Sequence, residues 1–178
     1  MKVVGKAAIN QDTEGRVADV GVHNGYAYLA AFRDPSCQKG GMYVFDIKDP
    51  TKPKQINFIR TGQDSYVGEG SQVIRIDTPQ FTGDVLAFNN EICGTHINST
   101  TVGGITLVDV TNPKVHKYLA QGVGDFEPVS RNAPGLAHEV HSTFMWDAGD
   151  KAYAVLVDDE ENADVDIMDI SNPAAPVK

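Results

Sequence analysis

One short motif occurs three times in this chain of 178 residues: an aspartate, a β-branched residue, a polar residue, an Asp or Asn, and a proline. The copies begin at Asp46, Asp109 and Asp169, so they recur with a period of about sixty residues. Each copy follows a run rich in β-branched or aromatic residues, which favours a strand, and Asp or Asn before proline favours a turn. The chain is therefore expected to fold as repeats of one small unit. Structural turn residues, and not catalytic residues, are predicted at Asp46, Pro50, Asp109, Pro113, Asp169 and Pro173.

Each repeat contains short runs that predict strands. In the first repeat Asn24 and Gly25 join two such runs, which is a strong hairpin signal. Paired glycines at 40–41 and 103–104 precede the third run of two repeats, where we expect backbone freedom and close packing. Four antiparallel strands repeated radially form the blade of a β-propeller. We predict one all-β repeat domain over residues 1–178, with β-propeller-like blades of four antiparallel strands and repeats at approximately 17–59, 70–121 and 138–178.

About three blades are too few to close a propeller, which usually has about four to eight. The chain is expected to be a partial propeller or a segment of a larger one, so its predicted partner is the rest of a larger propeller or a second copy. The run at 3–9 could supply the missing fourth strand of the third repeat. Single aromatic residues on strands usually pack in the core or between blades, and we expect this of Tyr28, Phe144 and Trp146.

The charge of the chain excludes one class of partner. Its formal net charge is −9 and its pI is about 4.9, whereas a phosphate backbone requires a basic face. We therefore expect no nucleic-acid partner. No apolar run approaches the roughly eighteen residues of a membrane span, so none is predicted. If the protein is exported, its signal peptide lies outside this chain.

Three stretches, at 27–30, 40–50 and 164–176, resemble the LVIVD-repeat family of bacterial secreted or surface proteins. The resemblance implies propeller-type blades and an extracellular or cell-surface location. It does not imply one activity, because propellers host many functions. Export would place the two cysteines, Cys37 and Cys93, in an oxidising compartment where they can form a disulfide. Two unrelated thiols are the alternative, because neither cysteine lies in a CxxC motif.

Two polar triplets, 89–91 and 158–160, occupy the same place in consecutive repeats. Their carboxylate and amide oxygens are suited to a hard cation, so Ca²⁺ is the first candidate cofactor. An EF-hand is excluded because Ala163 stands where that loop requires glycine. The segment 138–141 contains a His and Glu pair two residues apart that could bind Zn²⁺ as the second choice. The candidate ligand or metal residues are Asn90, Glu91, Glu139, His141, Asp158, Asp159 and Glu160.

These patterns leave three functions open. The first is a non-catalytic scaffold of an exported bacterial protein that binds a protein or glycan at the cell surface through variable loops. The second is a metal-dependent propeller hydrolase resembling a lactonase, although the chain has no Gly-x-Ser-x-Gly nucleophile motif. The third is a self-assembling structural repeat protein, because open strand edges require cover.

Overall fold

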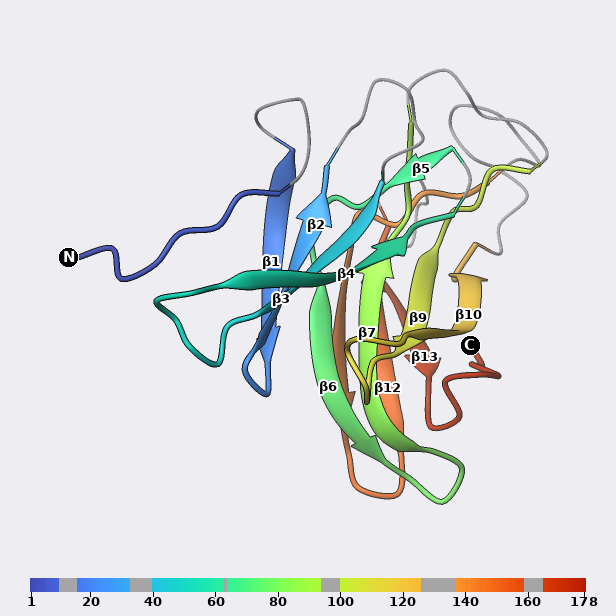
Figure 1. Ribbon diagram of the computed structural model, residues 1–178. Coiled ribbons are helices and arrows are strands. Elements are labelled where there is room, and N and C mark those ends of the chain that lie inside the picture. The colour runs from blue at the N-terminus through green and yellow to red at the C-terminus, as the bar shows by residue number, and fades with distance from the viewer. Residues whose placement is uncertain (10–15, 33–39, 63, 94–99, 126–136, 159–164) are drawn as a thin grey trace.

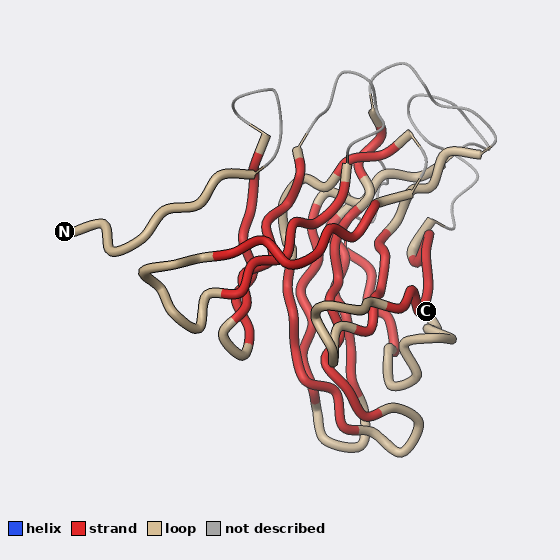
Figure 2. The backbone as a smooth tube through the Cα atoms, in the orientation of Figure 1, coloured by secondary structure: helices blue, strands red, loops and turns tan. Residues whose placement is uncertain are grey.

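The computed structural model describes residues 1–178 except 10–15, 33–39, 63, 94–99, 126–136 and 159–164. The described residues form thirteen strands and no helix, so the all-β prediction is confirmed. Accordingly, this part of the chain has no helix long and apolar enough to cross a membrane. Figure 2 shows how strands account for most of the described backbone.

The strands form three main sheets that we call blades 1, 2 and 3 (Figure 1). Blade 1 has the order β1-β2-β3-β4, blade 2 the order β10-β9-β7-β6, and blade 3 the order β11-β12-β13. A small fourth sheet pairs β5 with β8. The bounds of blade 1 are β1 (Val17–His23), β2 (Tyr26–Ala31), β3 (Gly41–Asp46) and β4 (Lys54–Arg60). Those of blade 2 are β6 (Gln72–Asp77), β7 (Thr82–Asn89), β9 (Ile105–Asp109) and β10 (Lys117–Val123). The remaining strands are β5 (Ser65–Tyr66), β8 (Glu91–Ile92), β11 (Ser142–Asp147), β12 (Ala152–Val157) and β13 (Val165–Asp169).

The antiparallel sheets are propeller-like blades and do not form a closed barrel. Their first strands lie next to one another, since β6 contacts both β1 and β11. The third sheet has three strands, and its ladder is extended by a single bridge between Asp169 and Val177. The prediction that residues 3–9 complete blade 3 is wrong, because Gly5 lies against the backbone of Pro50 in blade 1 and residues 1–9 form no strand.

Two apolar layers hold the blades together. Side chains alternate between the two faces of a strand, so each blade offers one face to the blade before it and one to the blade after it. Met42 and Val44 of β3 are fully buried against blade 2. Ile105 and Leu107 of β9 are fully buried against blade 3.

The aromatic residues divide between the core and the surface. Tyr28 is buried between blades 1 and 2, as predicted. Phe144 and Trp146 are 59% and 37% exposed, so the prediction that they pack in the core or between blades is wrong. Both project from β11 on the face of blade 3 that is turned away from blade 2, where the ring of Trp146 lies 5.3 Å from the ring of Tyr153 on β12.

The two ends of the blades differ. Hairpin turns at 24–25, 78–81 and 148–150 lie at one end, toward the bottom of Figure 1, which we call the turn rim. At the other end β2, β7 and β12 end at Ala31, Asn89 and Val157. We call this end the loop rim, and its described residues are 65–71, 89–93, 100–104 and 137–141.

Candidate functional site

Asn89, the last residue of β7, is fully buried at the loop rim. Its amide nitrogen donates to the carbonyl oxygens of Val140 and His141 at 3.0 and 2.6 Å. Its amide oxygen accepts a hydrogen bond of 3.1 Å from the backbone N–H of Gly68. One side chain of blade 2 therefore fixes the segments that lead into β6 and β11.

Asn90 is also fully buried, and both the nitrogen and the oxygen of its side-chain amide are hydrogen-bonded to other protein groups. The amide nitrogen donates to the carbonyl of Gly103 at 2.8 Å and to the hydroxyl of Thr106 at 3.1 Å. The amide oxygen accepts from the hydroxyls of Thr61 and Thr106 at 2.6 and 3.2 Å. Because both hydrogens and both lone pairs are used, a ligand at Asn90 would have to displace one of these bonds.

A buried pair of His138 and Asp158 lies beside this network. Nδ1 of His138 is 2.8 Å from Oδ2 of Asp158, and the two residues are 0% and 4% exposed. The backbone of His138 is held as well, since its N–H donates to Asp125 at 2.6 Å and its carbonyl accepts from Gly104 at 2.7 Å.

Glu91 and His141 form the part of the network that reaches solvent. The Glu91 carboxylate accepts a hydrogen bond of 3.1 Å from Asn89 and lies 3.6 Å from Nδ1 of His141. Glu91 is nearly buried, with its carboxylate against the Cα of Gly68, whereas the His141 side chain is 49% exposed. The carboxylate can accept hydrogen bonds from a polar ligand, and the exposed imidazole can both donate to it and accept from it.

The structure brings together some of the predicted ligand residues. Glu91 and His141 are neighbours, and Asp158 is close to His138 instead of to either of them. Glu139 is half-buried and forms a parallel backbone bridge with Gly104. Asp159 and Glu160 lie outside the described residues. Among the residues that are described, no group of three His, Cys, Asp or Glu side chains could hold a metal ion, so Ca²⁺ or Zn²⁺ binding stays a prediction.

The disulfide also stays a prediction. Cys93 is 3% exposed and directly follows β8, and its backbone N–H donates to the carbonyl of Asp64 at 2.9 Å. Cys37 lies outside the described residues.

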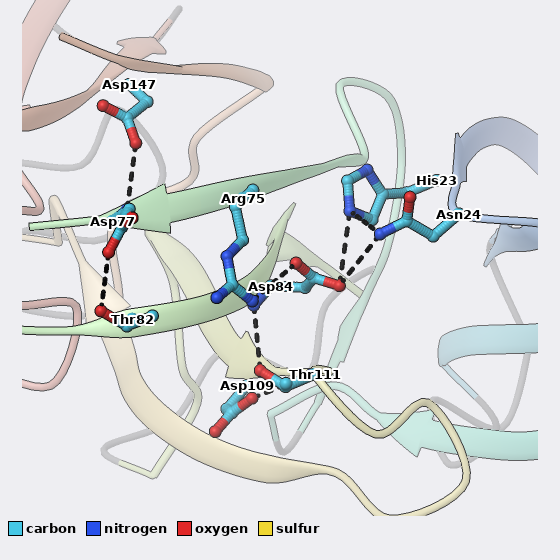
Figure 3. A network of polar contacts seen from close by, with 9 residues as sticks. All are labelled: His23, Asn24, Arg75, Asp77, Thr82, Asp84, Asp109, Thr111 and Asp147. Carbon is cyan, nitrogen blue, oxygen red and sulfur yellow. Dashed lines mark hydrogen bonds and ion pairs between the residues drawn. The ribbon is translucent and has the colours of Figure 1, made fainter. Parts of the chain in front are cut away.

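At the turn rim, polar contacts join neighbouring blades (Figure 3). The Asp84 carboxylate of blade 2 lies 3.4 Å from Nε2 of His23 in blade 1 and 3.5 Å from the guanidinium of Arg75. Asp147 of blade 3 accepts a hydrogen bond of 3.1 Å from the backbone N–H of Asp77. These contacts tie the three blades together at the end opposite the loop rim.

The aspartate that opens each repeated motif accepts a hydrogen bond from the backbone N–H two residues later, which is the contact of an Asx turn. The three bonds are Asp46 to Lys48 at 3.1 Å, Asp109 to Thr111 at 2.9 Å and Asp169 to Ser171 at 2.9 Å. Hydrogen bonds from the Lys151 ammonium and from Ser171 lower the pKa of Asp169 to about 2. The motif thus uses its carboxylates to form turns.

Four residues that organise the loop rim are absent from the list of candidate ligand residues: Thr61, Asn89, Asp125 and His138. His138 belongs to the segment 138–141, but its position beside Glu139 gives no sign that its partner is Asp158, twenty residues away. Thr61 and Asp125 lie in connections between blades, where strand periodicity gives no signal. The Asn89 triplet was found because it recurs at the same place as the 158–160 triplet.

Comparison with known families agrees with the repeat pattern. A family model described as the LVIVD repeat matches residues 14–61 and 152–178. The first match covers blade 1, and the second covers β12, β13 and the residues that follow them. No curated protein matches the chain at a significant level.

Proposed function

Because the chain carries LVIVD repeats in blades 1 and 3, we propose that it is a non-catalytic scaffold of an exported bacterial protein that binds a protein or glycan at the cell surface. The binding surface is the loop rim. One observation carries this proposal: buried polar side chains at that rim form hydrogen bonds with the backbone of neighbouring segments. Asn89, Asn90 and His138 together fix the segments that lead into β6, β9 and β11. Such a network supports a rigid platform on which loops can differ.

The turn rim has the features expected of a structural framework, and the loop rim has those expected of a recognition surface. At the turn rim the same motif recurs in each blade, with the same Asx hydrogen bond. The sequences that follow β2, β8 and β12, which end at the loop rim, share no motif: residues 33–39 contain Pro and Cys, 94–99 are mostly polar, and 159–164 are mainly acidic. Binding residues concentrate on loops that a rigid scaffold positions. The variable rim is therefore the better candidate for the binding surface.

Solvent-facing groups at the loop rim suggest the chemistry of the ligand. His141 and Glu69 are exposed there, and Glu91 lies beneath His141. Carboxylates accept hydrogen bonds from hydroxyl or ammonium groups, and neutral imidazole has one donor and one acceptor. Sugar hydroxyls and Lys or Arg side chains fit these groups, and the net charge of −9 also favours a basic protein surface.

The test is binding of the labelled chain to intact bacterial cells. A loop-rim variant, Glu69→Arg/His141→Glu, is compared with a turn-rim variant of the same charge changes, Asp150→Arg/Gln80→Glu, whose residues are also exposed. We expect the loop-rim variant to lose at least tenfold in affinity and the turn-rim variant to bind like the unchanged chain. Cells treated with protease or with periodate then distinguish a protein ligand from a glycan. Equal binding by both variants would remove the basis of the proposal.

A further inference from the structure

One position of the repeated motif differs between the blades. Seven residues after the motif aspartate stand Pro53 in blade 1 and Pro176 in blade 3, but His116 in blade 2. The side chain of proline neither titrates nor forms hydrogen bonds, whereas imidazole does both near neutral pH. Blade 2 therefore carries a titratable group where the other two copies of the motif carry none. His116 lies in the connection between β9 and β10, and its ring meets that of Tyr118 edge-on at 5.3 Å.

The partner of His116 is Asn57, which belongs to β4 of blade 1. In the strand register of blade 2 the equivalent position holds Ala120, which has no polar side chain. The amide oxygen of Asn57 accepts a hydrogen bond of 2.8 Å from the backbone N–H of Phe58. The amide nitrogen donates to the carbonyl of Pro113 at 3.1 Å and lies 3.1 Å from Nδ1 of His116. The two backbone partners fix which end of the amide faces the imidazole, because an N–H only donates and a carbonyl only accepts.

The orientation of Asn57 fixes the tautomer of His116. The amide nitrogen of Asn57 is a donor, so Nδ1 of the imidazole must accept, and the proton of the neutral ring is on Nε2. Protonation of the ring would add a hydrogen to Nδ1, and two donors would then face each other across 3.1 Å. This contact between blades 1 and 2 therefore requires the neutral imidazole.

The surroundings of His116 also oppose a charged ring. Partial burial lowers the pKa of this imidazole. On its own segment it is flanked by Lys114 and Lys117, which are exposed. From β4 the nearby charged residue is Arg60, whose backbone carbonyl accepts a hydrogen bond of 2.8 Å from the hydroxyl of Tyr118. Among the described residues no carboxylate forms an ion pair with His116. These charged neighbours are all cationic, so they favour the neutral ring.

We propose that the contact between Asn57 and His116 is a pH-sensitive switch, which holds the edge strands of blades 1 and 2 together at neutral pH and loosens them in acid. The two strands, β4 and β10, are each the last of their sheet. Above about pH 6.5 the contact contributes its full stability, and this contribution is lost as the pH falls through the lower pKa of the folded state. The apolar layer that includes Met42 and Val44 stays packed, so the change is local. The inference goes beyond the ligand binding proposed for the loop rim and does not depend on it.

Nitrogen-15 NMR of the unchanged chain tests the tautomer and its titration. The His116→Ala variant identifies the signals of His116 by their absence. At pH 7.5 we expect the ring to carry its proton on Nε2, and on acidification we expect it to titrate below about pH 6.5. A proton on Nδ1 at pH 7.5, or titration at or above about pH 6.5, would overturn the proposal.

A double-mutant cycle of Asn57→Ala and His116→Ala, followed by urea unfolding, measures how far the two side chains stabilise each other. The cycle is run at pH 7.5 and at one pH unit below the NMR midpoint of His116. We expect a coupling of about fivefold in the unfolding equilibrium constant at pH 7.5, as for one hydrogen bond, and of less than about 1.5-fold in acid. Tyr118→Phe is the matched control, because it removes a neighbouring bond between the same strands that has no group titrating in this range. Its effect should be equal at both pH values. An Asn57–His116 coupling that persists unchanged in acid would also overturn the proposal.

Discussion

The imidazole of His138 and the carboxylate of Asp158 form a buried pair, with Nδ1 and Oδ2 2.8 Å apart. His138 precedes β11 and Asp158 follows β12, so the pair joins the two ends of one hairpin where blade 3 reaches the loop rim. Burial makes the pair sensitive to the loss of one partner, because the remaining polar group would have to stay in a site without water.

We therefore predict that Asp158→Ala lowers the free energy of unfolding by about 3 kcal/mol, within the range seen when one partner of a buried pair is removed. The double variant His138→Leu/Asp158→Ala should lose less than the single variant, since it leaves no polar group unmatched. Urea unfolding followed by circular dichroism gives both values. A double variant less stable than Asp158→Ala would show that His138 contributes chiefly through its other contacts.

A second prediction concerns Gly103 in the double glycine before β9. A Cβ at this position would overlap the backbone of His138, and neither backbone can move easily because Gly104 and His138 are hydrogen-bonded. Gly103→Ala should therefore cost about 3 kcal/mol, the upper end of what steric conflict in a packed site typically costs. Gly122→Ala is the control, because Gly122 has a φ of +68° but its Cβ would have its nearest neighbour at 3.8 Å. There we expect only about 1 kcal/mol from backbone strain. The unfolding temperatures of the two variants, measured by thermal denaturation, test this difference.

The strands were predictable because their signals are local. Asn24 and Gly25 both have positive φ, 47° and 78°, as the predicted hairpin requires, and the motif aspartates end strands in each blade. The positions of Phe144 and of residues 3–9 were not predictable, since strand propensity does not show which other surface covers a strand. The partners of Asn89 and His138 depend on how consecutive blades stack. The repeated polar triplets indicated that polar side chains gather at the loop rim. They did not show which of these side chains form hydrogen bonds within the protein.

Alkaline pH should destabilise the chain through Tyr28. Burial, with smaller effects of the Asp84 carboxylate and of Tyr26, raises the pKa of this phenol in the folded state. Above about pH 10 the unfolded chain loses the proton and the folded chain keeps it, so stability falls as the pH rises. The stability difference between the unchanged chain and Tyr28→Phe should shift by up to about 1.4 kcal/mol per pH unit above pH 10, in favour of Phe. Urea unfolding at pH 8, 10 and 11 measures this shift, and parallel curves for the two proteins would contradict the prediction.

The two cysteines provide a prediction about the oxidised protein. We expect a disulfide between Cys37 and Cys93, because the protein is proposed to be exported and Cys93 is buried at the loop rim. A bridge that closes a loop of roughly fifty-five residues stabilises by about 4 kcal/mol, or roughly 10 °C in a domain of this size. Peptide mass mapping without reductant identifies the bridge, and unfolding with reductant measures its effect. The Cys37→Ser/Cys93→Ser variant should not respond to reductant. Two titratable thiols in the native oxidised chain would exclude the bridge.

The contacts that Glu91 and Asp158 make within the protein also lead to a prediction about metal removal. Glu91 is held by Asn89 beside His141, and Asp158 is paired with His138, so a cation at either carboxylate would have to replace an existing contact. We therefore expect dialysis against EDTA to leave the unfolding temperature unchanged, and added CaCl₂ to act only as NaCl of equal ionic strength does, through screening of the net charge of −9. A calcium site would instead stabilise by about 2.7 kcal/mol at a hundred times its dissociation constant. If CaCl₂ produced such a rise, and Asp159→Asn/Glu160→Gln abolished it while Asp150→Asn at the turn rim did not, the metal-dependent function would replace the non-catalytic scaffold.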